Sequence, residues 1–233
     1  MTRSNRQGWL LSTALSMVLV FAGGAVSAAE TKPPEVDSNG LHLVHDSKLR
    51  LVYALPGASL SGYDKVILVD AYVAFRKHWL EDRRETSIDP LAINKKDVEE
   101  LKQRVADEFK KEMTKELEKK GYAVVDKTET GADVLIVRPA IINLDISAPD
   151  IGMASMHTYF VRSAGEMTLY AELYDSVSSQ MLVKVIDPEA DDKWAGTGVR
   201  ANEVTNRAAA DEIIRKWADV LASHLHEVVK NPK

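Results

Sequence analysis

The chain has 233 residues, which is enough for one or two domains with a sizeable hydrophobic core. With 45% hydrophobic and 28% charged residues, 12 Gly and 8 Pro, it is neither collagen-like nor wholly disordered. A formal net charge of -5 argues against binding to nucleic-acid phosphates, which favours clustered basic residues, so we expect no nucleic-acid partner.

The first 28 residues have the organisation of a Sec-type signal peptide. Arg3 and Arg6 precede an apolar run over residues 9–22, and the small residues that follow predict cleavage near Ala28 or Ala29. The run is shorter than the ~20 residues that span a bilayer, which favours a cleaved signal over a retained anchor. We therefore predict a periplasmic or secreted protein with no transmembrane segment in the mature chain.

The chain contains no cysteine. In an oxidising compartment this excludes a disulfide framework, a thiol nucleophile and a thiolate metal site. It also excludes a lipid-bearing cysteine at the end of the signal, so we predict that the protein is not a lipoprotein.

Residues 29–48 are polar, contain Pro33 and Pro34 and show no periodicity, so we expect a flexible leader before a single domain over residues 49–230. Strands are predicted over residues 51–55 and 65–75, which are rich in β-branched and aromatic residues.

The strongest helix signal covers residues from about 95 to 120. Asn94 and Asp97 have the spacing of a capping box, and Gly121 follows the last turn. Apolar residues recur at helical spacing at Val98, Leu101, Val105, Phe109, Met113 and Leu117.

The second half of the chain predicts further strands and a closing helix. Residues 122–125 and 133–147 are strand-like, and Pro139 favours a bulge or an edge position in the second of these. Apolar and polar residues alternate over 167–174, which with residues 181–186 predicts an antiparallel hairpin. An apolar stripe from about 202 to 229 predicts a C-terminal helix. The predicted fold class is α+β: a single domain in which an antiparallel or mixed β-sheet packs against a central helix and a C-terminal helix.

Three segments in this order carry a family resemblance. They are Pro56-Gly57-Ala58-Ser59-Leu60-Ser61-Gly62-Tyr63, Leu173-Tyr174-Asp175-Ser176 and Lys216-Trp217-Ala218-Asp219-Val220-Leu221. With them the chain resembles the domain of unknown function 3313 family, bacterial envelope proteins that are mostly predicted lipoproteins. The resemblance implies an envelope setting, and it transfers no activity and no functional residues. This sequence departs from the pattern in lacking the lipid-accepting cysteine.

No catalytic signature is complete. The Gly57–Gly62 segment resembles the Gly-x-Ser-x-Gly elbow of serine hydrolases, but Ser61 stands where the second glycine is required, and the following residues are strand-like rather than helical. A turn that leads into a strand is the favoured interpretation. We predict no catalytic residue and no cofactor.

Metal-binding patterns are equally weak. His42 and His45 are three residues apart within the predicted leader, and the acidic residues over 187–192 lack the glycine and terminal glutamate of a standard Ca²⁺ loop. A solvated leader and a solvated acidic loop are the favoured interpretations, and we predict no metal site.

Residues 148–165 form an unusually long and apolar connector. Met153, Met156, Tyr159 and Phe160 would form an adaptable contact surface for a partner if they are exposed. The alternative is that the segment folds back onto the sheet as part of the core.

These observations favour an exported, non-enzymatic envelope protein that binds another envelope protein or envelope component. The alternative is an envelope hydrolase that uses a carboxylate pair, since 35 acidic residues leave many candidates. A stress-related or structural role is a third possibility.

Overall fold

A computed structural model describes residues 32–86, 94–146, 159–161, 165–190, 199–201 and 203–230. No described helix is both long enough and apolar enough to cross a membrane. The elements in chain order are β1 (His42–Leu43), β2 (Leu51–Ala54), β3 (Lys65–Leu68), β4 (Tyr72–Phe75), α1 (Trp79–Thr86), α2 (Lys95–Lys119), β5 (Ala123–Val125), β6 (Val134–Ile146), β7 (Tyr159–Val161), β8 (Gly165–Asp175), β9 (Met181–Ala190), β10 (Val199–Ala201) and α3 (Glu203–Lys230).

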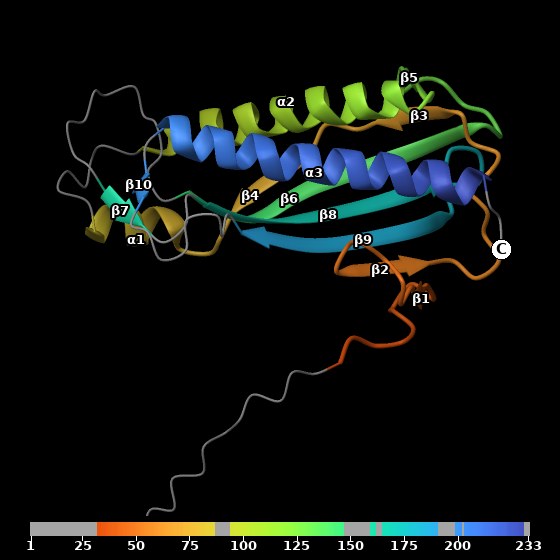
Figure 1. Ribbon diagram of the computed structural model, residues 1–233, viewed down its shortest axis with the longest axis horizontal. Coiled ribbons are helices and arrows are strands. Elements are labelled where there is room, and N and C mark those ends of the chain that lie inside the picture. The colour runs from red at the N-terminus through yellow and green to blue at the C-terminus, as the bar shows by residue number, and fades with distance from the viewer. Residues whose placement is uncertain are drawn as a thin grey trace, which may run out of the picture. The chain divides into compact units, whose positions relative to one another are not determined.

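Eight of the described strands form one large mixed sheet in the order β1-β2-β9-β8-β6-β3-β5, and β4 also pairs with β6 (Figure 1). Strands β3 and β4 run parallel to β6, and β3 also runs parallel to β5, whereas the other pairs of this sheet are antiparallel. Strands β7 and β10 form a separate antiparallel pair. The predicted α+β class with a mixed sheet is therefore confirmed.

Helix α2 begins as the sequence predicted. The Asn94 side chain accepts hydrogen bonds from the Lys96 and Asp97 backbone N–H groups at 2.8 and 3.3 Å, and the Asp97 carboxylate accepts from the Asn94 N–H at 2.8 Å. This reciprocal capping box satisfies N–H groups that have no partner within the helix. Gly121 follows the helix with a φ of 92°, a left-handed conformation that glycine adopts at little cost.

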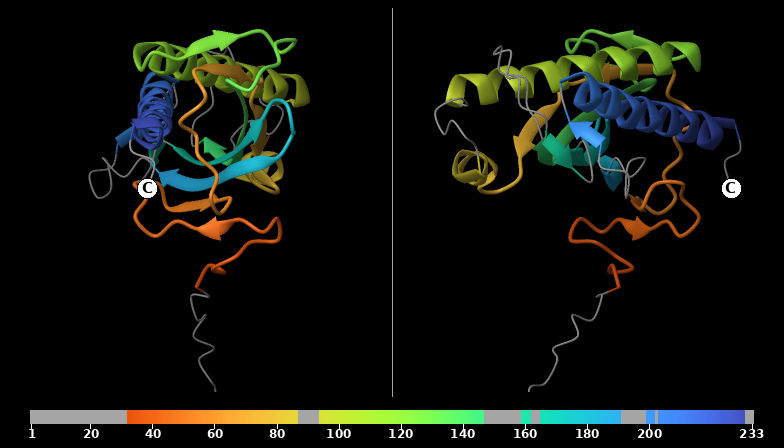
Figure 2. Two further views of the ribbon diagram at one scale, coloured as in Figure 1. Left: turned by 90° about the vertical axis from the view of Figure 1, so that its right-hand side faces the viewer. Right: turned by 60° about the vertical axis from the view of Figure 1, so that its left-hand side comes forward.

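Helices α2 and α3 lie on the same face of the sheet, here called the inner face (Figure 2). Their buried side chains and the inner-face side chains of the strands form one hydrophobic core. Burial of these side chains removes their apolar surface from water, which is the main favourable term in folding. The most buried members include Phe109, Met113 and Leu117 of α2, Ile214 and Trp217 of α3, and Leu169, Ala171 and Leu173 of β8.

Strand β8 shows the alternation that the sequence predicted. Leu169, Ala171 and Leu173 are buried in the core, whereas Tyr170 and Glu172 between them are only half-buried. The antiparallel pairing of β8 with β9 confirms the predicted hairpin.

The predicted strand over residues 65–75 is divided into β3 and β4, which pair with successive parts of β6. Pro139 lies inside β6, which has neighbours on both sides, so the predicted edge position is wrong. The position of Pro139 along β6 explains why a proline is tolerated in this strand. The parallel pairing with β3 ends at Val137 and that with β4 begins at Ala140, so Pro139 falls where that ladder is interrupted. The bulge comes later, at Asn143, which has a φ of 54°.

The ordered fold begins before residue 49, the start predicted from the sequence. Within the predicted flexible leader, Val36 bridges to His42, β1 pairs with β2, and Leu41 is fully buried. Helix α1 was also missed, because only Trp79 and Leu80 in it are apolar. The Trp79 ring packs on Phe75 with centroids 4.2 Å apart, which holds α1 at the end of β4.

Candidate binding surface on the outer face of the sheet

Four side chains form a row across the face of the sheet opposite α2 and α3, here called the outer face. Strand register places Arg138 of β6 opposite Glu172 of β8, Glu172 opposite Lys184 of β9, and Lys184 opposite Tyr53 of β2. Directly opposed residues of antiparallel strands project to the same side and interact. The outer-face row therefore alternates positive, negative and positive charge and ends in an aromatic ring.

Glu172 lies at the centre of a pair of tyrosines on its own strand. Its two carboxylate oxygens accept hydrogen bonds from the Tyr170 hydroxyl at 2.7 Å and the Tyr174 hydroxyl at 2.8 Å. The pKa of both tyrosines is raised, mainly by burial and secondly by the hydrogen bond to this carboxylate. Both hydroxyls are therefore protonated donors at neutral pH. The carboxylate is fixed in position by these two bonds.

Arg138 is the exposed cation of the outer-face row. Its guanidinium lies over the Tyr174 ring, 5.7 Å from the centroid, and its nearest carboxylate oxygen, on Glu172, is 3.8 Å away. A separation of 3.8 Å is longer than a hydrogen bond, so within the described part of the chain no carboxylate is hydrogen-bonded to Arg138. The Arg138 side chain is 59% exposed.

Lys184 also lies over a tyrosine ring, but unlike Arg138 it is buried. Its ammonium lies 5.4 Å from the centroid of the Tyr53 ring and forms a buried ion pair with Asp37 of the N-terminal segment. The other Asp37 oxygen accepts from the Asn39 and Leu41 backbone N–H groups at 2.8 and 2.9 Å. Burial acts to raise the pKa of Asp37, but these hydrogen bonds and the Lys184 charge outweigh it, so the pKa is lowered.

The outer face continues onto β4 through Tyr72. This residue pairs with Ala140, two positions beyond Arg138 on β6, and its side chain is 67% exposed. Diagonal neighbours on one face of a sheet lie roughly 7–8 Å apart, within reach of long side chains. Tyr72 and Arg138 therefore provide an exposed aromatic ring and an exposed cation on the same face.

The contact surface predicted over residues 148–165 is only partly described. Met153 and Met156 lie outside the described residues. Tyr159 and Phe160 belong to β7, where they pair with Ala201 and Arg200 of β10. Their side chains are not among those described, so their role as partner contacts stays a prediction.

Residues of the weak catalytic and metal motifs bond to neighbouring side chains. Ser59 and Ser61 bond to each other at 2.7 Å, and His45 pairs with Glu35 at 3.1 Å. Among the described residues, no group of three or more His, Asp or Glu side chains is arranged to hold a metal ion.

The expected solvated acidic loop is wrong for Asp187. This carboxylate is buried on β9, where it accepts from the Trp217 indole N–H at 2.8 Å and from the Arg50 backbone N–H at 2.7 Å. It therefore joins α3 to the sheet and to the residue that precedes β2. The next acidic residue of the same segment, Glu189, pairs with Lys216 of α3.

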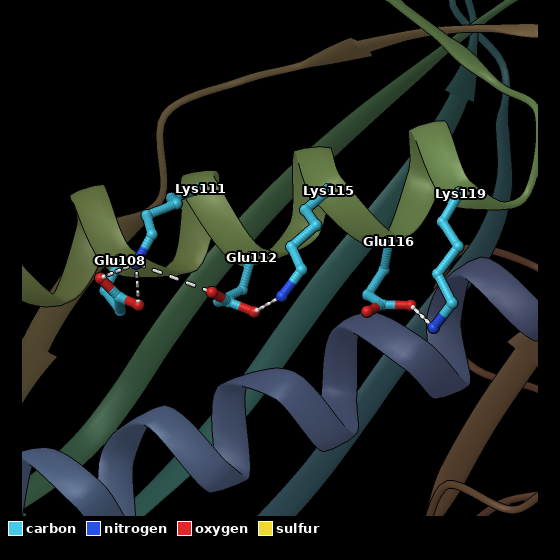
Figure 3. Close-up of polar contacts among 6 residues, drawn as sticks. All are labelled: Glu108, Lys111, Glu112, Lys115, Glu116 and Lys119. Carbon is cyan, nitrogen blue, oxygen red and sulfur yellow. Dashed lines mark hydrogen bonds and ion pairs between the residues drawn. The ribbon is translucent and has the colours of Figure 1, made fainter.

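Among the described residues, the most buried glutamates are Glu112 and Glu116, which lie on the side of α2 that faces α3 (Figure 3). Each forms an ion pair with the lysine three residues later, at 3.3 Å to Lys115 and 2.9 Å to Lys119. Both carboxylates are thus occupied by lysines at a helix–helix seam. This arrangement is structural and gives no support to a catalytic carboxylate pair.

Five described aspartates have altered pKa values, and in all five the pKa is lowered because their donor contacts outweigh burial. A general acid needs the opposite shift. The five are Asp37, Asp70, Asp126, Asp133 and Asp175.

The segments that carry the family resemblance contact other parts of the fold. The Tyr63 hydroxyl donates to the Asp175 carboxylate at 2.9 Å, which joins the first segment to the second. In the third segment, Trp217 donates to Asp187. Tyr63, Asp175 and Trp217 maintain the fold, and none of these three belongs to the outer-face row, whereas Tyr174 of the second segment lies beneath Arg138.

Solved structures with a distant likeness to this chain include two proteins of bacterial origin. The PelC dodecamer from Paraburkholderia phytofirmans has 10% identity and a TM-score of 0.38, with 72% of this chain and 96% of that chain covered. A PDZ domain protein from Parabacteroides distasonis has 9% identity and a TM-score of 0.36, with 72% of this chain and 33% of that chain covered. Neither likeness carries a functional inference at these scores.

No curated protein sequence matches the chain. The family model for a protein of unknown function, DUF3313, matches residues 43–221, which span the sheet, α2 and most of α3. The chain therefore belongs to the DUF3313 family.

Proposed function

We propose that this chain is an exported, non-enzymatic protein that binds another protein of the bacterial envelope through the outer face of its sheet. The observation that carries this proposal is the exposed pair of Arg138 and Tyr72 on a sheet face whose opposite side holds the core. Arginine and tyrosine are enriched among the residues that dominate binding energy at protein interfaces.

The arrangement around Arg138 supports binding because it is held before any partner arrives. The Tyr174 ring lies beneath the guanidinium, and the Tyr174 hydroxyl is fixed by Glu172. A side chain that is already positioned loses less conformational freedom on binding.

Export rests on the signal-like first 28 residues. The test is the mass of the full-length gene product recovered from the periplasmic fraction of a bacterial host. We expect a chain that begins at residue 29 or 30. Recovery of the intact chain in the cytoplasmic fraction would contradict export.

Binding is tested by in-cell photo-crosslinking with a photoreactive amino acid at position 72 of the exported protein. Lys115 is the control position, because it is similarly exposed but lies on α2. Position 159 tests the contact surface predicted from the sequence.

We expect one discrete crosslinked species from position 72 that is absent from position 115 and is reduced when Arg138→Gln is also present. Capture from position 159 alone would contradict the outer-face proposal and would favour the predicted 148–165 surface. Equal capture from all three positions would indicate non-specific contact and would contradict both surfaces.

A further inference from the structure

The outer face contains two cations that each lie over a tyrosine ring, and only one of them has a close carboxylate. Lys184 lies over Tyr53 and is bonded by Asp37, whereas Arg138 lies over Tyr174 with no carboxylate oxygen within hydrogen-bond distance among the described residues. We propose that Arg138 is a docking site for a glutamate or aspartate side chain in an acidic segment of a partner protein. This inference rests on the proposed function and names the chemistry of its partner.

The Lys184 site shows what a completed version of this arrangement looks like. Asp37 lies 147 residues before Lys184 in the sequence. The Asp37 side chain also accepts a hydrogen bond from the Asn39 backbone N–H, so it contacts the sheet as part of a backbone turn. Leu41 of the same segment is fully buried close to that turn. A polypeptide segment therefore already supplies a carboxylate to this face and a buried apolar residue in the same turn, which favours a peptide as the second ligand over a glycan or a lipid headgroup.

Arg138 does not obtain the same partner from within the described chain. Both oxygens of the nearest carboxylate, Glu172, are engaged by Tyr170 and Tyr174. The 3.8 Å separation between Arg138 and Glu172 supplies charge attraction without a hydrogen bond. The planar guanidinium is thus available to bind an incoming carboxylate through two parallel N–H donors.

Tyr72 adds an apolar contact next to this cation. It is exposed on the neighbouring strand, and a tyrosine ring buries a large area with little loss of side-chain freedom. The site therefore fits an acidic side chain followed or preceded by an apolar one, as Asp37 and Leu41 are combined in the N-terminal segment.

The test is fluorescence anisotropy of the purified exported protein with a labelled (Glu-Gly-Ser)6 peptide at low salt, with (Gln-Gly-Ser)6 as the neutral control. We expect the acidic peptide to bind about tenfold more tightly than the neutral one, the effect of one charge-assisted hydrogen-bonded pair. Arg138→Gln should remove that difference. Arg138→Lys should retain only part of it, because an ammonium cannot form the planar two-donor contact.

Arg50→Gln is the matched control, since Arg50 is an exposed arginine with no ring contact among the described residues. This substitution should leave binding unchanged. Glu172→Gln should strengthen binding, because it removes the negative charge nearest to Arg138. Near-ultraviolet circular dichroism of each variant checks that the fold is retained.

Several results would overturn the assignment. They are equal binding of the two peptides, full binding by Arg138→Gln, or binding confined to an acidic polysaccharide or to anionic vesicles offered in parallel. If position 72 still captures a partner while the acidic peptide does not bind, the carboxylate assignment fails and the proposed function stands. If position 72 captures nothing, the proposed function fails as well.

Discussion

The two faces of strand β8 differ in what surrounds them, although their residues alternate along the same backbone. On the inner face, Leu169 and Ala171 are completely buried beneath the helices. On the outer face, Tyr170 and Glu172 are half-buried and bonded to each other. The comparison shows that periodicity separates the faces of a strand, whereas long-range contacts decide what each face does.

The inner face also contains a buried carboxylate, and each of its two oxygens accepts a hydrogen bond. Asp187 bonds to the indole of Trp217 and to the backbone of Arg50. Buried charged groups are tolerated when hydrogen bonds compensate for lost hydration. The outer face, in contrast, leaves the Arg138 donors exposed, which adds little to stability and leaves them available to a partner.

The largest change in the free energy of unfolding is expected at Trp217, which is fully buried on the inner face. Trp217→Ala should lower the free energy of unfolding by about 3–5 kcal/mol, because it leaves a cavity and an unpaired Asp187 oxygen. Urea denaturation measures this change. Trp217→Phe keeps most of the ring and should cost less; an equal loss in the two variants would contradict a packing contribution.

Breaking the covered ion pair should come next. Asp37→Ala leaves the Lys184 ammonium buried without its carboxylate, and the free energy of unfolding should fall by about 3 kcal/mol. The double variant Asp37→Leu with Lys184→Met removes both charges and should recover most of that loss. If Asp37→Ala unfolds at the wild-type urea concentration, the N-terminal segment is not held as described.

Alkaline pH should destabilise the fold through its tyrosines. Burial raises the pKa of Tyr122 to about 12, and burial together with Asp175 raises that of Tyr63 to about 12. A raised pKa in the folded state gives stability that is complete below pH 10 and is lost as pH rises through 12. Phenolate absorbance should therefore lag behind that of the urea-unfolded chain between pH 10 and 12. Superimposable titrations of the folded and unfolded chains would contradict this prediction.

A smaller effect is expected where two of the family-resembling segments meet. Tyr63→Phe removes the hydrogen bond to Asp175 and should cost about 1 kcal/mol in urea denaturation. Tyr72→Phe removes the hydroxyl of an exposed tyrosine and is the matched control with no expected cost. A neutral Tyr63→Phe would mean that this contact does not stabilise the joint between the segments.

The sequence was sufficient to predict the elements whose signals are local. The Asn94–Asp97 capping box and the alternation over residues 167–174 both depend on near neighbours, and both are confirmed. It did not predict the parallel pairing of β3 and β4 with β6, because that pairing depends on contacts far apart in sequence.

The outer-face row was missed for the same reason. Alternation identifies Tyr170, Glu172 and Tyr174 as one face of a strand, and this was the available signal. Register across four strands is needed to bring Arg138 and Lys184 beside Glu172, and Tyr53 beside Lys184. The sequence around Asp37 predicts a flexible leader because its partner Lys184 lies 147 residues away.

The most direct test of the difference between the faces is the free energy of unfolding of the double variant Arg138→Gln with Tyr72→Ser. Both side chains are exposed, so we predict a change within about 0.5 kcal/mol of wild type, together with loss of the tighter binding of the acidic (Glu-Gly-Ser)6 peptide. A loss of stability of about 2 kcal/mol or more would contradict the account, because it would mean that these outer-face residues serve to hold the fold together.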